Sequence, residues 1–322
     1  MVSLVASASG LIVSQFVRGL TPPGSPTFLK TISLEKKTFM NKPFFVIAFT
    51  LFVGAAIGFQ TAKFGPVNPD PNGVRPIEAA DTLFIEDMTW MEVRDAMKSG
   101  KDTVIVATGG IEQNGPYLVA GKHNVILRAT TDAVARRLGN ALIAPIVGFV
   151  PEGDIDPPTV HMNYPSTVSL TEETYRRLLI DICSCYRTHG FKHIVLLGDS
   201  GGNGAGMKTV AETLNAQWKE GKTRIHFIPE YYNYGDVKKW LEEQGLKQTD
   251  DNIHDDFPIT AMMLSVDPSS VRMKQRIAAG KFKINGIDLA PVEKTIEWGK
   301  KITSYRAEVA VKAIRASLQK TP

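Results

Sequence analysis

The sequence has few of the features that mark a disulfide-rich, redox or nucleic-acid-binding protein. Its 322 residues include only two cysteines, Cys183 and Cys185. Residues two apart on a helix point to different faces, so these cysteines are not expected to pair with each other. The net charge is +4, and the Lys and Arg residues are spread along the chain rather than gathered into one basic segment. A nucleic-acid partner is therefore not expected.

Long apolar runs are also scarce, and the most prominent one lies near the N-terminus. Residues 44–59 read FFVIAFTLFVGAAIGF without a charge, and lysines precede them at positions 36, 37 and 42. This order is typical of a signal peptide, which residues 40–62 would form if translation began at Met40. An uncleaved membrane anchor through 44–59 is the closest alternative. Either alternative predicts an exported protein, periplasmic or membrane-anchored and facing outward.

The segments around this apolar run divide the rest of the chain. Residues 1–39 precede the export signal and are expected to be a non-native or disordered extension. Residues 63–80 include four prolines, which indicates a linker. The remaining residues, 81–322, are enough to bury one sizeable core and are expected to form the folded domain.

Short apolar runs alternate with helical patterns in this domain. Runs at 103–108, 141–147, 193–197 and 224–229 resemble buried parallel strands, which are apolar on both faces. Residues Ser169 to Glu172 have the pattern of a capping box, followed by helical spacing of apolar residues as far as His189. The alternation predicts a three-layer α/β/α domain with a mainly parallel sheet. Ligands of such a domain normally bind beyond the carboxyl ends of the strands.

Three polar clusters lie where that rule places a site, at 112–123, 199–203 and 254–256. The first contains GGIEQNGPYL from position 109, with His123 further on, and the second contains GDSGGN from position 198. His161 with YPST at 164–167 is a further motif, and so is the segment from His254 to Ala261. In this order, from about Met88 to about Lys301, the motifs resemble those of the creatininase (creatinine amidohydrolase) family.

The resemblance implies an α/β metal-dependent hydrolase of non-peptide C–N bonds, with two divalent metals bridged by a carboxylate and often a homo-oligomeric assembly. Of the residues that match the family's ligands, Glu112 is retained. Asn114 stands in place of a ligand histidine, His123 in place of the bridging aspartate, and Ser200 in place of the histidine of the second motif. The family's Glu-Thr-Ser is replaced by Ile-Thr-Ala at 259–261.

These replacements allow two interpretations. In the first, the site is rearranged, and Glu112, His123 and Asp199 hold one zinc, manganese or iron ion with an open position for water. A catalytic role, as further ligand or general base, then falls to His254, Asp255 and Asp256.

In the second interpretation catalysis is lost, and Asn114, Ser200 and Asn203 line a polar pocket that binds a ligand without metal. Tyr117 and His161, which fall in the matching motifs, join these three as candidate substrate-binding residues. The sequence therefore predicts a metal-dependent hydrolase acting on an amide-type C–N bond of a small molecule. The alternative is a metal-free ligand-binding protein that keeps the same fold.

Overall fold

The computed structural model describes residues 2–7, 10–15, 70–250 and 254–320. The chain divides into two units, Met1–Asn72 and Gly73–Pro322. In the first unit, β1 (Val2–Ser7) and β2 (Gly10–Gln15) pair as an antiparallel sheet that the sequence analysis does not predict. The predicted export signal at 40–62 lies outside the described residues. Among the residues that are described, no helix combines the length and the apolar character needed to span a bilayer.

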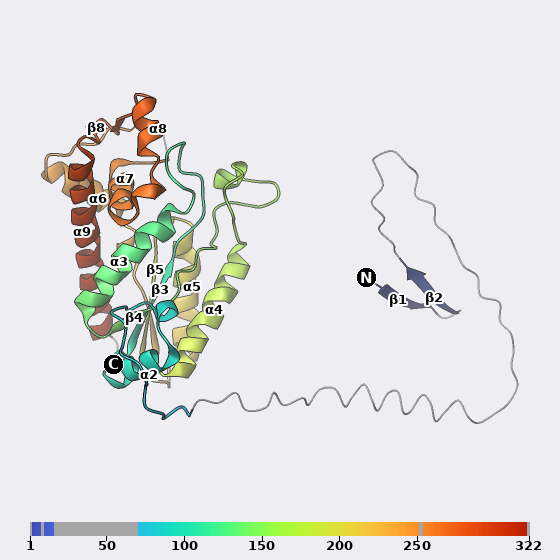
Figure 1. Cartoon of the computed structure of the whole chain (residues 1–322). Coiled ribbons are helices and arrows are strands. Elements are labelled where there is room, and N and C mark those ends of the chain that lie inside the picture. Colours follow the sequence, from blue (N-terminus) through green and yellow to red (C-terminus); the bar gives the residue numbers. More distant parts are fainter. Residues whose placement is uncertain (1, 8–9, 16–69, 251–253, 321–322) are drawn as a thin grey trace, which may run out of the picture. The chain divides into compact units, whose positions relative to one another are not determined.

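A four-stranded parallel sheet forms the centre of the larger unit (Figure 1). Its strands, in the order β4-β3-β5-β6, are β4 (Ala141–Ile143), β3 (Thr103–Thr108), β5 (His193–Gly198) and β6 (Arg224–Phe227). Every residue of β3 is buried, because helices cover both faces of the sheet. The predicted strands are found, but β4 ends at Ile143 rather than Val147. Val147 instead forms an isolated bridge with Thr108.

Two layers of helices enclose the sheet. On one face pack α2 (Trp90–Lys98), α4 (Glu172–His189) and α5 (Asn203–Gln217), through a core that includes Val104, Leu179 and Val210. On the other face pack α3 (Lys122–Leu138) and α9 (Val292–Gln319), through a core that includes Ile105 and Ile314. Alternate residues of β3 thus face different helical layers. The arrangement confirms the predicted three-layer α/β/α fold.

A third group of elements lies at the end of the larger unit opposite α2 (Figure 1). It consists of α6 (Tyr234–Glu243), α7 (Phe257–Val266), α8 (Met273–Ala278) and the short strands β7 (Lys283–Ile284) and β8 (Ile287–Asp288). These elements have their own apolar core with α9. Single 3-10 turns are η2 (Ile85–Asp87), η3 (Val160–Asn163), η4 (Pro229–Tyr231) and η5 (Pro268–Ser270).

The start of α4 differs from the prediction of a capping box. The N-cap of α4 is Thr171, whose hydroxyl accepts a hydrogen bond from the backbone nitrogen of Thr174. Ser169 instead accepts from the backbone nitrogen of Glu152 at 2.9 Å and donates to the carbonyl of Gly153 at 2.6 Å. Its hydroxyl therefore fixes the loop after β4 rather than the helix. The end of α4 is as predicted, with Gly190 at a φ of 99° after His189.

Candidate active site

A cavity of about 420 Å³ opens among the loops that follow the strands. Its walls come from the loops after β3, β4, β5 and β6, from the first turns of α3 and α6, and from the segment around the start of α7. Polar side chains from these segments face the cavity: Glu112, Lys122, His123, Glu152, His161, Ser200, Tyr232, Tyr234, His254, Asp255 and Asp256. The cavity is where a parallel α/β sheet is expected to bind its ligand.

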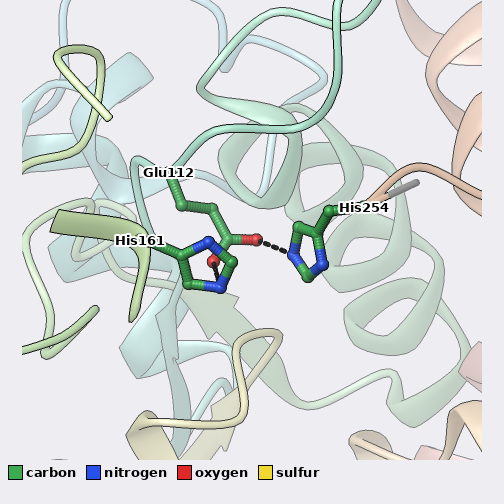
Figure 2. Close-up of side chains that lie close together, drawn as sticks. All are labelled: Glu112, His161 and His254. Carbon is green, nitrogen blue, oxygen red and sulfur yellow. Dashed lines mark hydrogen bonds and ion pairs between the residues drawn. The ribbon is translucent and has the colours of Figure 1, made fainter. Parts of the chain in front are cut away.

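Glu112, in the loop after β3, is the centre of this set. Its Oε1 lies 2.8 Å from Nζ of Lys122 and 2.9 Å from Nε2 of each of His123 and His254. Its Oε2 lies 3.2 Å from Nε2 of His161. Figure 2 shows His161 and His254 on either side of the carboxylate. Burial alone would raise the pKa of Glu112, but the hydrogen bonds of His123 and His254 and the charge of Lys122 lower it well below its usual range.

His123 lies between two carboxylates. Its Nε2 faces Glu112, and its Nδ1 lies 2.8 Å from Oδ2 of Asp199. Burial opposes protonation of His123, yet the bonds to Asp199 and Glu112 raise its pKa. Asp199 is fully buried behind the histidine, where the charge of Arg306 and the His123 bond lower its pKa against the effect of burial. A carboxylate behind a histidine is the arrangement that orients histidines at metal sites.

Glu152, in the loop after β4, completes the site and is missed by the sequence analysis. Its Oε2 accepts a hydrogen bond from Ser200 at 3.0 Å, and its Oε1 is buried without a hydrogen-bond partner. Burial and the nearby charge of Glu112 raise the pKa of Glu152 to about 8. Gly110 leaves room for this carboxylate, since a Cβ there would lie 2.0 Å from Oε1. The position of Glu152 after a predicted strand was the available sequence signal.

Two sets of donor atoms among the described residues are close enough to share a metal ion. One set is Glu112 with His161 and His254, and the other is Glu112 with His123 and Glu152. In each set the donor atoms lie within 4.8 Å of one another. His161, predicted to bind substrate, and His254, predicted to be catalytic, thus join Glu112 as candidate ligands. Asp199, predicted as a ligand, contacts His123 from behind and is not part of either set.

Three predicted substrate-binding residues do not line the cavity. The amide nitrogen of Asn114 donates to the backbone carbonyls of residues 112, 119 and 120 at 2.9 to 3.2 Å. That of Asn203 donates to the carbonyls of residues 108 and 109 at 3.0 and 2.9 Å. The ring of Tyr117 lies 4.9 Å from the guanidinium of Arg276. These side chains hold the loops in place, whereas Ser200 does face the cavity.

The two aspartates after His254 line the cavity, but their carboxylates are engaged by other groups of the protein. Oδ2 of Asp255 lies 3.1 Å from Nη1 of Arg276, and both side chains are buried. Asp256 is the N-cap of α7 and accepts a hydrogen bond from the backbone nitrogen of Ile259 at 2.8 Å. Burial raises the pKa of Asp256. Of the predicted catalytic residues, His254 alone contacts Glu112 in the described part of the chain.

The fold and the carboxylate–histidine cluster define an α/β domain with a candidate metal-binding site at the carboxyl ends of its strands. Residues 86–310 match the family model described as creatinine amidohydrolase, so the chain belongs to the creatininase family. It is also similar to 3-dehydro-scyllo-inosose hydrolase of Thermotoga maritima, with 24% identity over 126 residues. That match covers 39% of this chain and 38% of the relative.

Solved creatininase structures share the fold. A tryptophan-to-alanine mutant creatininase is 19% identical with a TM-score of 0.57, over 75% of this chain and 100% of that one. A structure described as "Creatininase Mn" is 19% identical with a TM-score of 0.53, over the same shares. A glutamate-to-glutamine mutant of "Zn-Zn type" is 19% identical with a TM-score of 0.51, over 76% and 100%. Likeness at this identity establishes the fold alone, and two of these relatives carry zinc or manganese by their descriptions.

Proposed function

We propose that this chain is a metal-dependent hydrolase that cleaves a non-peptide C–N bond, of amide type, in a small molecule. The observation that carries the proposal is the convergence of Glu112, His161 and His254 on one side of the cavity. Nitrogen and carboxylate oxygen donors in one set suit zinc, manganese or iron. A cavity of about 420 Å³ is in the range of small-molecule sites.

The chemistry of the donors agrees with a bound cation. Two donor sets share the Glu112 carboxylate, and each combines carboxylate oxygen with imidazole nitrogen. A divalent ion would be held by Glu112, His161 and His254, with His123 and Glu152 as the second donor set. Such an ion lowers the pKa of water and polarises a carbonyl oxygen.

The other residues of the cavity have roles that follow from their contacts. Asp199 fixes the orientation of His123, because its Oδ2 lies 2.8 Å from Nδ1 of that ring. Glu152 faces the cavity with one oxygen held by Ser200 and the other without a partner. It is therefore placed to exchange a proton with a bound substrate, as a general acid or base must. Tyr232 is 45% exposed and offers a substrate an aromatic wall.

Two observations favour the alternative of a metal-free binding protein. The positions that match the family's ligand histidines are Asn114 and Ser200, and both bond to groups of the protein itself. In addition, the ammonium of Lys122 already lies against Glu112. The alternative therefore needs a direct test of both metal and catalysis.

The test is an assay of the purified protein with and without metal. The protein is stripped with a chelator, reloaded with zinc or manganese, and offered a panel of cyclic and linear amides. 3-Dehydro-scyllo-inosose, the compound named in the Thermotoga maritima relative, is assayed beside them; it has no C–N bond, so its turnover in place of the amides would contradict the proposed bond type. We expect hydrolysis that disappears on stripping and returns on reloading. Glu112→Gln should abolish it, whereas Arg136→Met, on the exposed face of α3, should not.

Two outcomes would contradict the proposal. Turnover that persists after treatment with the chelator would show that catalysis does not depend on a metal. Saturable binding of a panel compound without turnover, unchanged by chelation, would favour the binding protein. Export, a homo-oligomeric state and a boundary of the domain near residue 81 stay predictions.

A further inference from the structure

Lys122 lies in an unusual place for a lysine. It is the first residue of α3, where the backbone carries partial positive charge that disfavours a cationic side chain. The side chain is also only 5% exposed, and lysines are rarely buried unless they are paired. Both effects cost stability, so the position calls for a compensating interaction.

That compensation comes from Glu112. Nζ of Lys122 lies 2.8 Å from Oε1 of Glu112, whose own side chain is 3% exposed. The same oxygen is approached by His123 and His254 at 2.9 Å each, so three nitrogens surround it. Oε2 has a single close neighbour among these groups, His161 at 3.2 Å. The carboxylate therefore already has a resident positive charge on its Oε1 side.

A second acidic group next to the site, Asp199, is neutralised as well. Nη2 of Arg306 lies 2.6 Å from Oδ1 of Asp199, and both side chains are buried. Asp199 therefore adds no uncompensated negative charge for a second metal ion. A dication held by Oε1 of Glu112 with His123 and Glu152 would lie within a few ångströms of the Lys122 ammonium, where repulsion between buried charges is strong. An ion next to His161 would be held by the other carboxylate oxygen, Oε2.

We propose that the Lys122 ammonium takes the electrostatic place of a second metal ion, so that the cavity binds one divalent cation rather than two. The inference rests on the proposed metal site, in which Glu112, His161 and His254 hold the remaining ion. It also explains how the site tolerates Asn114 and Ser200 at positions where the family resemblance implies ligand histidines. Removal of the lysine charge should then open the second donor set to an ion.

The test is the zinc stoichiometry of the full chain, measured by calorimetric titration and by elemental analysis after dialysis. We expect about one zinc per chain for the parent protein and about two for Lys122→Gln, which keeps a polar side chain but removes the charge. Lys122→Met gives a second, apolar variant. Lys101→Met is the matched control, since Lys101 bonds the carbonyl of Gly139 on the exposed surface and should leave the count unchanged.

Thermal melting with and without zinc keeps the test informative if a variant is weakened. A ligand that binds the folded state raises its melting temperature, and an additional ion raises it further. The zinc-induced shift should therefore be larger for Lys122→Gln than for the parent protein.

Four results are decisive. Two zinc ions in the parent protein, or one in both the parent and the Lys122 variants with equal shifts, would overturn the inference and leave the proposed metal site standing. Zinc in the variants alone would overturn the inference of one ion in the parent protein and contradict the metal dependence proposed for it. No zinc in any of them would overturn both.

Discussion

Nη2 of Arg306 lies 2.6 Å from Oδ1 of Asp199, and the two side chains are at most 2% exposed. Arg306 comes from α9 and Asp199 from the loop after β5, so the pair joins the last helix of the chain to the base of the site. The guanidinium also lies over the rings of Tyr231 and Tyr234, at 4.4 and 4.6 Å from their centroids. Asp199 in turn orients His123. The C-terminal helix is therefore needed for the geometry of the cavity.

Arg306→Met should destabilise the protein by about 3–5 kcal/mol, because it leaves the Asp199 carboxylate buried without its counter-charge. Arg136→Met is the control, since its pairs with Asp81 and Asp132 are exposed and such pairs contribute at most about 1 kcal/mol. Urea unfolding of both variants measures the difference. An equal loss in the free energy of unfolding of the two variants would mean that the buried pair contributes no more to stability than the exposed pairs.

Asn114→Ala should cost about 1–3 kcal/mol, because the backbone carbonyls of residues 112 and 119 lose the amide donor in a buried setting, whereas that of residue 120 keeps the backbone nitrogen of Glu112. The loop carries Glu112, so zinc affinity should fall as well. Asn163→Ala is the matched control, in which an exposed amide loses a single bond to the carbonyl of Val160. Chemical unfolding and zinc titration of both variants test this. An Asn114→Ala protein as stable as the parent would refute the structural role of Asn114.

Gly299→Ala should destabilise the contact between α7 and α9. A Cβ at Gly299 would lie 2.0 Å from the carbonyl oxygen of Ala261, and backbone atoms cannot give way as a flexible side chain can. We expect a loss of about 1–3 kcal/mol. Gly204→Ala in α5 meets no atom within 4 Å and should be neutral or stabilising by up to about 1 kcal/mol. The melting temperature should therefore fall for Gly299→Ala and stay unchanged or rise for Gly204→Ala.

His226 makes the stability of the fold depend on pH. Burial, assisted by His193, lowers the pKa of His226 from 6.5 to about 4. As the pH falls below 6.5 the unfolded chain therefore takes up a proton that the folded protein refuses, and stability falls until the pH reaches about 4. The loss between pH 7 and pH 5 should be about 2 kcal/mol.

The contribution of His226 is isolated by His226→Gln, which keeps a polar group near Ser317. Urea unfolding at pH 7 and pH 5 should show a smaller loss in this variant than in the parent protein. Equal losses in both would assign the pH dependence to other groups.

The sequence predicted the sheet well because buried parallel strands are continuous apolar runs, and β3 is found with the predicted bounds. Residues 145–147 continue the apolar pattern but are not part of the strand that pairs with β3, so β4 is shorter than predicted. The start of α4 was misjudged because Ser169 and Thr171 are both able to cap a helix. The sequence pattern cannot show which of the two caps the helix, because that depends on the loop of Glu152, whose backbone nitrogen donates to the Ser169 hydroxyl.

The site was predicted where its residues follow strands, and where they fall in the family's motifs, as His161 and His254 do. Glu112 and His123 were expected and lie in contact, whereas Arg306 is 107 residues beyond its partner Asp199 and no spacing rule links them. Lys122 was missed because a lysine at the start of a helix normally lies in solvent. The sequence also could not show in which direction a side chain points. Asn203 and Ser200 are both predicted to bind substrate, but Asn203 bonds to the backbone and Ser200 lies at the cavity.

The most direct test of the account is the anomalous diffraction of crystals grown with zinc. We expect a zinc peak at about 2.0–2.2 Å from the Glu112 carboxylate and from Nε2 of His161 and His254. A cavity without a peak, with zinc found only at exposed sites such as His189, would contradict the central claim that Glu112 is the centre of a metal site.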